Sequence, residues 1–185
     1  ARTSTVYKMN LAACTTSIGR SRINDASRGV KEWAEEAGRE APEVIYGDTD
    51  SIFVKFSRQK DGKLLEGKEA LQDSIDCGQL AGKYITDMIH LEQGHTQQIL
   101  EYEKTFWPFI LISKKRYTGD KYELNTEDCK RTSMGIVLKR RDNAPIVKYV
   151  FGNVIEIIMM EKNFEKAKAW LNDTLQRIRL GEFDM

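Results

Sequence analysis

Two acidic residues in a predicted turn, Asp48 and Asp50, are the first groups whose types and spacing could do chemistry. Runs of β-branched and aromatic residues at 44–46 and 51–56 flank them, which predicts a hairpin with a tight acidic turn. Residues two apart in an extended chain point the same way, so we expect both carboxylates to aim at one point. Two carboxylates so close together repel each other unless a cation binds them. Mg²⁺ accepts one or two protein carboxylates besides water and substrate phosphates. The bare D-x-D spacing is common by chance, but its place between two apolar strands favours a Mg²⁺ site.

A cluster of basic residues is the second candidate. Lys114, Lys115 and Arg116 precede Tyr117 and follow an apolar strand, and a second basic run consists of Lys139, Arg140 and Arg141. Basic side chains attract phosphates, and an adjacent aromatic ring can pack on a sugar or base, so the strand-borne cluster suits a nucleic-acid track. Each run taken alone is more simply explained as a solvated basic face.

The elements that must position these residues are helices and strands in alternation. We expect an amphipathic helix at residues 15–37, capped by Thr15 or Thr16 and followed by Gly38, and a second helix at 68–89. Residues 78–84 echo a P-loop, but one residue is missing between the glycines, so we expect helix interior there. A small antiparallel sheet is predicted from strands at residues 99–104, 109–113, 117–123 and 133–138. Pro145 opens a helix and another covers residues 164–178, ended by Gly181, which together predict an α+β domain followed by a helical one.

The composition is that of an ordinary globular chain, with 185 residues, 41% hydrophobic, 31% charged and a net charge of +1. No apolar run reaches the roughly 18–20 residues of a membrane helix and no leader opens the sequence, so neither a membrane span nor a signal peptide is expected. The three cysteines form no C-x-x-C pair, which disfavours a disulfide framework or a zinc site. Residues 31–80 hold 7 basic and 12 acidic side chains, whereas residues 110–150 hold 10 and 5. This polarity suits metal ions at one place and phosphates at another, or two solvated faces of opposite sign.

Several stretches together resemble the family B DNA polymerases. The hairpin turn is similar to the family's Y-G-D-T-D-S motif, and it consists of Tyr46, Gly47, Asp48, Thr49, Asp50 and Ser51. Residues 111–117 match its K-K-R-Y motif, and residues 101–104 resemble its E-x-E-K strand. Residues 134–148 resemble the palm-to-thumb junction, most closely that of large eukaryotic DNA viruses. Order, spacing and element type agree over most of the chain.

The resemblance implies an α+β fold, in which an antiparallel palm sheet with flanking helices is followed by the start of an α-helical thumb. Residues 1–141 would be the C-terminal part of the palm, and residues 142–185 the beginning of the thumb. Asp48 and Asp50 would be catalytic, with Asp50 the principal ligand of two Mg²⁺ ions and Asp48 a weaker or water-mediated one.

The resemblance also implies the partners, which are primer–template DNA and a dNTP, and it leaves room for a processivity factor in the full-length protein. Lys115 would reach the minor groove near the primer terminus, supported by Lys114, Arg116 and Tyr117. Lys139, Arg140 and Arg141 would contribute to holding the duplex by its backbone. The activity would be DNA-directed DNA synthesis in replication, at an intracellular site that is the host nucleus or a cytoplasmic replication site if the source is viral.

The sequence departs from the family pattern before the hairpin. Neither the D-x-x-S-L-Y-P motif nor the K-x-x-x-N-S-x-Y-G helix occurs between Ala1 and Tyr46. We therefore expect an incomplete catalytic domain that does not polymerise alone. Two alternatives stay open: a nucleic-acid-binding module without catalysis, and a D-x-D glycosyltransferase with Mn²⁺, which would leave the basic cluster without a role.

Overall fold

Two compact units divide the part of the chain that the structure, a computed structural model, describes, namely residues 8–94, 97–139 and 141–183. The first unit holds the described residues up to Thr105 together with Tyr122–Asp128. The second holds Phe106–Lys121 and the described residues from Cys129 onward. The predicted boundary between residues 141 and 142 is not tested by this division and stays a prediction.

Helix α1, Met9–Glu36, begins six residues before the predicted start. The prediction that Thr15 or Thr16 caps it was wrong, because both lie inside the helix, where their hydroxyls donate to the carbonyl oxygens of Leu11 (2.9 Å) and Ala12 (3.1 Å). The preceding residues are rich in strong helix formers such as Met, Leu and Ala, so the helix continues toward the N-terminus. Gly38 follows its last turn as predicted, with φ +63°.

The predicted acidic hairpin is confirmed as β1, Glu43–Asp48, paired antiparallel with β2, Ser51–Lys55. A second, unpredicted hairpin follows, formed by β3, Gln59–Lys60, and β4, Lys63–Leu64. Asp61 and Gly62 connect these short strands, both with positive φ. Asp-Gly is a strong two-residue hairpin signal, so this element was readable from the sequence.

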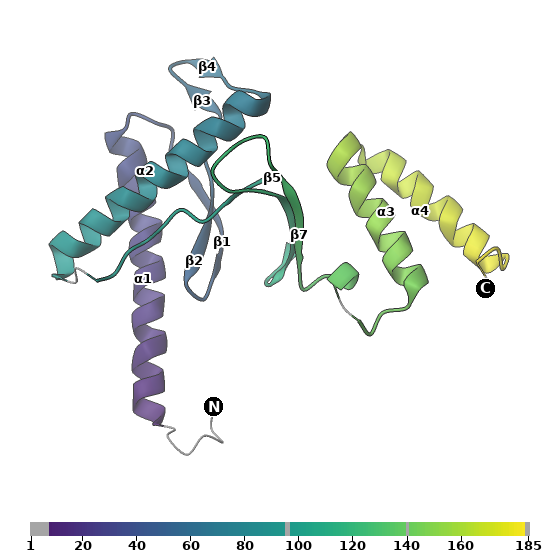
Figure 1. Ribbon diagram of the computed structural model, residues 1–185, viewed down its shortest axis with the longest axis horizontal. Helices are drawn as coiled ribbons and strands as arrows, with labels where there is room; N and C mark the ends of the chain where they lie inside the picture. Colours follow the sequence, from purple (N-terminus) through teal and green to yellow (C-terminus); the bar gives the residue numbers. More distant parts are fainter. Residues whose placement is uncertain (1–7, 95–96, 140, 184–185) are drawn as a thin grey trace. The chain divides into compact units, whose positions relative to one another are not determined.

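Helix α2, Gly67–Gln93, confirms the second predicted helix and ends at Gly94 in the left-handed conformation. It packs against α1 and the acidic hairpin in the core of the first unit, which Figure 1 shows in purple to teal. The buried members of this core are Ala26, Val30, Trp33, Ala34, Cys77, Ala81, Ile85, Met88 and Ile89. The N-terminal part of α1 extends beyond this packing in both ribbon views, and residues 8–18 are exposed.

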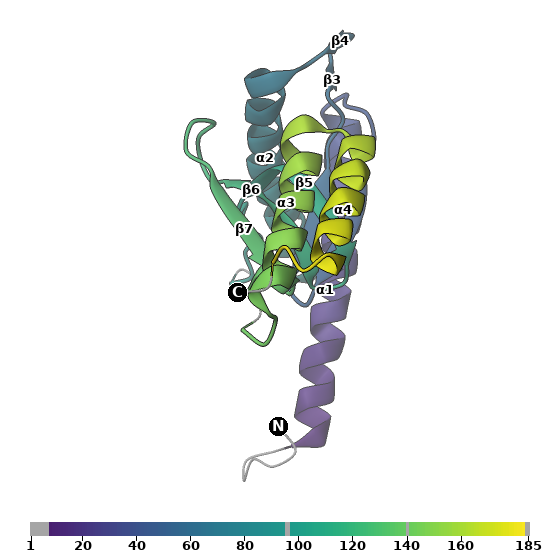
Figure 2. The same ribbon diagram turned by 90° about the vertical axis from the view of Figure 1, so that its right-hand side faces the viewer.

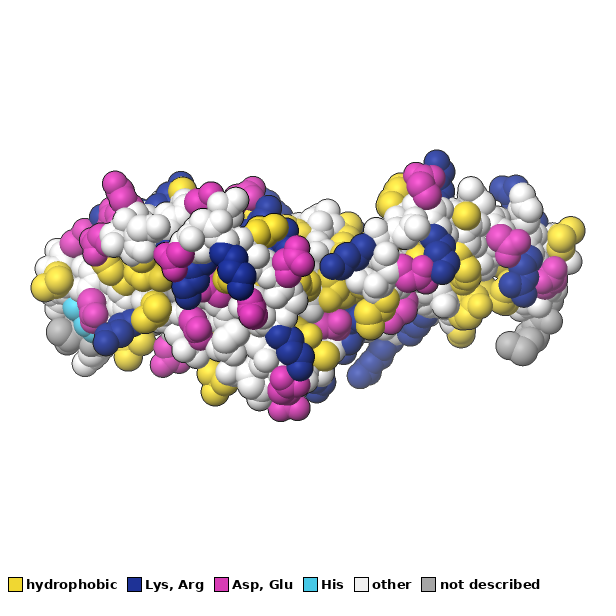
Figure 3. All heavy atoms as spheres, turned by 90° about the horizontal axis from the view of Figure 1, so that it is seen from above, with side chains coloured by type: hydrophobic (Ala, Val, Ile, Leu, Met, Phe, Trp, Pro, Cys, Tyr) yellow, Lys and Arg dark blue, Asp and Glu magenta, His cyan; other side chains and the backbone are white. Residues whose placement is uncertain are grey.

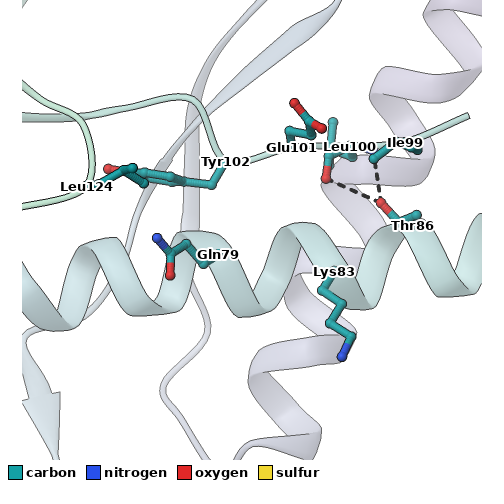
Figure 4. A pocket seen from close by; sticks show the side chains of 8 residues that line it. All are labelled: Gln79, Lys83, Thr86, Ile99, Leu100, Glu101, Tyr102 and Leu124. Carbon is teal, nitrogen blue, oxygen red and sulfur yellow. Dashed lines mark hydrogen bonds between the residues drawn. The ribbon is translucent and has the colours of Figure 1, made fainter.

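The strand predicted at residues 99–104 was wrong, since this segment runs alongside α2 without forming a strand. Two glycines of α2 make room for it: an added Cβ on Gly78 would lie 2.6 Å from the Tyr102 ring, and one on Gly82 would lie 3.0 Å from the Leu100 carbonyl oxygen. Thr86 satisfies the backbone of Leu100, accepting from its N–H (2.9 Å) and donating to its carbonyl oxygen (3.3 Å), as Figure 4 shows. The segment therefore bonds to a helix where a strand would bond to a neighbouring strand. The helix-interior prediction for the glycines is confirmed.

The second unit contains a sheet in the order β5-β6-β7. Strand β5 is Thr105–Ser113, β6 is Arg116–Tyr122 and β7 is Lys130–Met134. Strands β6 and β7 pair antiparallel, with Tyr117 opposite Met134 at one end of the ladder and Lys121 opposite Lys130 at the other. The strand predicted at residues 133–138 was wrong beyond Met134, because Gly135 turns with φ +61° and Val137–Lys139 forms a 3-10 helix, η1.

Helices α3, Pro145–Glu161, and α4, Phe164–Arg179, confirm the predicted helical end of the chain and lie side by side (Figures 1 and 2). Ile136, Ile155 and Met159 form a buried hydrophobic cluster in this unit. Arg131 of β7 bonds to Asp120 of β6 and to Glu156 of α3, at 2.8 Å for the latter. The predicted α+β class is confirmed. In the described part of the chain, no helix combines the length and apolar character required to span a membrane.

Candidate functional site

The acidic turn consists of Thr49 and Asp50, between the last residue of β1 and the first of β2. The N–H of Asp50 donates to the carbonyl oxygen of Asp48 at 2.6 Å, which closes the chain into a turn around Thr49. The Ser51 hydroxyl donates to the same carbonyl oxygen at 3.2 Å, and the Thr49 hydroxyl donates to the Asp48 carboxylate at 3.1 Å. Asp48 is half-buried and Asp50 is exposed. The turn thus holds one oriented carboxylate and presents a second to solvent.

Thr49 adopts an unusual backbone conformation, with φ +55°. A β-branched residue rarely occupies the left-handed region, where its Cβ crowds the carbonyl oxygen. Such residues occur where surrounding contacts over-determine them, often at functional sites. The backbone between the two aspartates is therefore turned, and our assumption of an extended chain from Asp48 to Asp50 was wrong. That the carboxylates of Asp48 and Asp50 bind the same metal ion stays a prediction.

The hairpin has support from its own rings and from α1. The rings of Tyr46 and Phe53, which are cross-strand partners, have centroids 5.3 Å apart. An added Cβ on Gly19 of α1 would lie 4.0 Å from the Thr49 carbonyl oxygen, and one on Gly47 would lie 3.7 Å from Ile23. Of the motif-supporting residues, Thr49 lies in the turn, Tyr46 and Gly47 lie in β1, and Ser51 is the first residue of β2.

The carboxylate oxygens of Asp48 and Asp50 are the type of ligand that a hard divalent cation such as Mg²⁺ prefers. Among the described residues, no group of three or more His, Cys, Asp or Glu side chains could hold a metal ion. Asp48 and Asp50 would thus be a partial ligand set, completed by water, substrate or groups outside the described residues.

The basic turn consists of Lys114 and Lys115, which join β5 to β6. Both lysines and Arg116 are exposed, and Lys115 adopts φ +59°. Tyr117 is 8% exposed, and its ring lies 5.9 Å from that of Phe106 and 5.6 Å from that of Phe109. The structure therefore gives Tyr117 a packing role beneath the turn, while its predicted contact with DNA stays a prediction.

The second basic run follows the sheet. Lys139 ends η1 and is exposed, and Arg141 is exposed in the connection to α3. Arg140 lies outside the described residues. The acidic turn belongs to the first unit and both basic runs to the second. On the face drawn in Figure 3, acidic and basic side chains are interspersed, so no single sign of charge covers it.

A buried electrostatic cluster of the first unit includes no residue of either turn. Arg39 and Lys60 bond to the carboxylate of Asp73, the latter at 3.1 Å, and Asp73 is 7% exposed. Burial raises the pKa of Asp73, but the hydrogen bonds from Arg39 and Lys60 outweigh it, so the pKa lies below its ordinary value of 3.8. Burial likewise raises the pKa of the neighbouring Cys77 thiol to about 11. The cluster joins the segment that follows α1, the β3–β4 hairpin and α2, which makes it structural.

Two hollows of the first unit contain none of the predicted site residues. One, of about 400 Å³, lies between α2 and the segment at 99–102 that runs alongside it, where Figure 4 shows Tyr102 and Leu124 beside Gln79. The other, of about 440 Å³, adjoins Asp73 and Cys77. The residue that sequence reasoning missed is Gly135, which touches the basic turn. Its only sequence signal was a glycine inside a predicted strand.

The structure thus contains a hairpin that presents carboxylates and a second hairpin that presents lysines, the two features from which the sequence predicted metal binding and nucleic-acid binding. Residues 1–185 match the model of DNA polymerase family B, and the chain belongs to that family. It is 46% identical over 185 residues to a DNA polymerase of Pyramimonas orientalis virus, covering all of this chain and 14% of the relative. This confirms the resemblance that the motifs indicated.

Other relatives agree. A DNA polymerase of Acanthamoeba polyphaga mimivirus is 40% identical over 144 residues, which are 77% of this chain and 8% of the relative. The DNA polymerase delta catalytic subunit of Schizosaccharomyces pombe is 32% identical over 177 residues, which are 95% of this chain and 15% of the relative. The chain therefore spans less than a fifth of the length of each of these relatives.

Proposed function

We propose that the protein carrying this chain is a template-directed DNA polymerase, which transfers a nucleotide from a dNTP to the 3′ hydroxyl of a primer in DNA replication. The observation that carries the proposal is the acidic hairpin, with Asp48 and Asp50 at its turn, in a chain of DNA polymerase family B. The names of the relatives, DNA polymerase and DNA polymerase delta catalytic subunit, support it.

The acidic turn would hold the catalytic Mg²⁺ ions. The exposed Asp50 would be the principal ligand, and the half-buried Asp48 a weaker or water-mediated one. When bound, the two ions supply activation of the primer 3′ hydroxyl and stabilise the charge of the triphosphate. The hydroxyls of Thr49 and Ser51 keep Asp48 and its carbonyl in place, so the turn is ordered before a substrate arrives.

The basic turn would contact primer–template DNA. Acceptors in the minor groove occur in every base pair, so Lys115 can check the shape of a pair without reading its sequence. The exposed Lys114 and Arg116 would neutralise phosphates. Lys139, Arg140 and Arg141 would hold the duplex by its backbone. A processivity factor is a further partner, and synthesis would take place at a replication site inside the cell, in the host nucleus or the cytoplasm.

The chain itself would be part of the catalytic domain, from the palm into the start of the thumb. Its sequence contains neither the D-x-x-S-L-Y-P motif nor the K-x-x-x-N-S-x-Y-G motif. We infer that residues 1–185 alone do not extend a primer. Template-dependent incorporation by the purified chain would contradict this.

The experiment that tests the proposal is Asp50→Asn in the complete protein that contains this sequence. Synthesis should fall by at least roughly 10²–10³-fold, because the amide loses the negative charge that holds the metal ions, while DNA affinity stays largely unchanged. The measurement is primer extension alongside DNA binding by fluorescence anisotropy. Asp61→Asn is a matched control, since Asp61 is also exposed in a two-residue hairpin turn of the first unit and should retain synthesis.

The outcomes separate the alternatives. Full synthesis by the Asp50→Asn variant would remove the acidic turn from the mechanism. A wild-type protein that binds primer–template DNA without extending it would support a non-catalytic binding module. Metal-dependent hydrolysis of a sugar nucleotide, without DNA binding, would support the glycosyltransferase alternative.

A further inference from the structure

Gly135 lies one residue beyond β7, directly against the basic turn. It has φ +61°. An added Cβ there would overlap the carbonyl oxygen of Lys115 and would lie 3.1 Å from the Lys115 carbonyl carbon and 3.3 Å from Cγ of Arg116. The crowded atoms of Lys115 are backbone atoms, which cannot rotate away as a side chain would. Any larger residue at position 135 must therefore displace the turn or itself.

Three other described glycines with positive φ do not share this crowding. Gly38, Gly62 and Gly94 have φ between +63° and +76°, and an added Cβ on each would meet nothing within 4 Å. These three need glycine for the backbone angle alone. Gly135 needs it for the angle and for the close approach to Lys115.

Gly135 is itself held from both sides along the chain. Before it, Met134 pairs with Tyr117 at the end of the β6–β7 ladder, and Ser133 shares a 2.8 Å hydroxyl hydrogen bond with Thr118. After it, Ile136 is 3% exposed and packs in the core with Ile155 and Met159 of α3. Because both neighbours are fixed, Gly135 cannot move aside, so its surface limits where the Lys115 carbonyl can lie.

We propose that Gly135 is a positioning residue, which sets the place of the Lys114–Lys115 turn and so the direction in which Lys115 meets primer–template DNA. The proposal rests on the proposed function, in which this turn contacts DNA. If the proposal holds, the buried cluster of Ile136, Ile155 and Met159 also supports the basic turn, because Ile136 directly follows Gly135.

The test uses Gly135→Ala in the complete protein, with Gly62→Ala as the matched control. Both variants place a Cβ at a positive φ, but only position 135 is crowded. The dissociation constant for primer–template DNA should rise roughly five- to tenfold for Gly135→Ala, a loss comparable to that of one Lys contact, and should stay near wild type for Gly62→Ala. Equal effects of the two variants would overturn the proposal.

Gly135→Asn separates the requirement for a positive φ from the requirement for space beside Lys115, because asparagine tolerates the left-handed conformation but carries a Cβ. We expect it to weaken DNA binding as Gly135→Ala does. Recovery of wild-type affinity would show that the backbone angle alone matters, and would overturn the positioning role.

A double-mutant cycle that combines Gly135→Ala with Lys115→Ala distinguishes positioning of Lys115 from a general effect on stability. The quantity measured is the coupling between the two losses of DNA affinity. If Gly135 acts through the turn, its substitution should add little once the Lys115 side chain is absent. Full additivity of the two losses would overturn the proposal. All of these measurements use DNA binding, so an absence of primer extension by the wild-type protein would refute the proposed function and leave the role of Gly135 still testable.

A second pair of variants serves if substitutions at position 135 do not fold. Ile136→Ala and Ile155→Ala open cavities in the same core, but only Ile136 adjoins Gly135. We expect Ile136→Ala to weaken DNA binding several-fold more than Ile155→Ala at matched loss of stability. Equal losses of affinity would overturn the proposal.

Discussion

The acidic and basic hairpins both place a non-glycine residue in the left-handed region, but different contacts stabilise the two turns. Each has a two-residue turn with one non-glycine residue in the left-handed region, Thr49 at φ +55° and Lys115 at φ +59°. The acidic turn is stabilised by neighbours in sequence, since the hydroxyls of Thr49 and Ser51 both bond to Asp48. The basic turn is limited by Gly135, twenty residues later, and rests on the buried ring of Tyr117.

The difference teaches how far each hairpin depends on the rest of its unit. Local hydrogen bonds form wherever the hairpin forms, so the acidic turn should tolerate changes in the distant core. The basic turn needs the aromatic cluster below it and the β7 end beside it, both of which assemble only when the second unit packs. We therefore expect the basic turn to be lost first when packing is weakened.

The largest effect in this comparison should come from Tyr117→Ala. Removing this ring, which packs against those of Phe106 and Phe109, should lower the free energy of unfolding by about 3 kcal/mol and weaken DNA binding, because the turn loses the packed ring beneath it. Urea unfolding measures the first effect and fluorescence anisotropy the second. Tyr149→Ala is the control, since Tyr149 is 45% exposed and its loss should cost much less.

Tyr117→Phe sharpens the result by keeping the ring and removing the hydroxyl. If Tyr117 acts through packing, this variant should bind DNA almost as wild type does. Lost affinity at unchanged stability would instead show that the hydroxyl contacts DNA.

An intermediate effect is expected at Asp73, which supports the unit of the acidic hairpin. Asp73→Ala should lower the free energy of unfolding by about 2–3 kcal/mol, because it leaves Arg39 and Lys60 without their shared carboxylate. Synthesis by the folded variant should persist, since the cluster includes no residue of either turn. Urea unfolding at pH 7 and primer extension are the measurements.

The pH dependence of stability provides an independent check. The pKa of Asp73 is lower in the folded protein than its ordinary value of 3.8. Its stabilising contribution is therefore present above that value and is lost as the pH falls through the lower, folded pKa. Below pH 3.8, wild-type stability should fall more steeply than that of Asp73→Asn. Parallel curves for the two proteins would contradict the shift.

The smallest effect should come from Thr49→Gly. Glycine removes the left-handed strain, a gain of about 1 kcal/mol, but it also removes the exposed hydrogen bond to Asp48 and frees the unfolded chain, so the net change should lie within about 1 kcal/mol. Melting temperature measures it. Synthesis should fall, because Asp48 loses a contact that orients its carboxylate. Unchanged synthesis would show that the Thr49 hydroxyl does not matter for the site.

The elements that were predicted correctly are those whose information is local. The acidic hairpin follows from its alternation of β-formers and turn residues, and α3 from Pro145 at its start and its apolar periodicity. The β3–β4 hairpin had an equally local signal in Asp61-Gly62, which we overlooked.

The errors arose where a partner distant in sequence decides the conformation. Residues 99–104 have the composition of a strand, but the backbone of Leu100 bonds to Thr86 of α2. The segment can approach the helix this closely because Gly78 and Gly82 carry no side chain. The strand expected at 133–138 stops at Gly135, because the chain must pass the Lys115 carbonyl and then bury Ile136.

The sequence by itself determined the family, the helices α1 to α4 in outline, and the residues at the acidic turn, because these depend on motifs and periodicities a few residues long. Only the tertiary structure decided that Thr49 turns the chain between its two aspartates, that Tyr117 is buried, and that Gly135 bears on Lys115. Those facts depend on backbone angles and on contacts between segments far apart in the chain, and neither leaves a pattern that spacing alone can reveal.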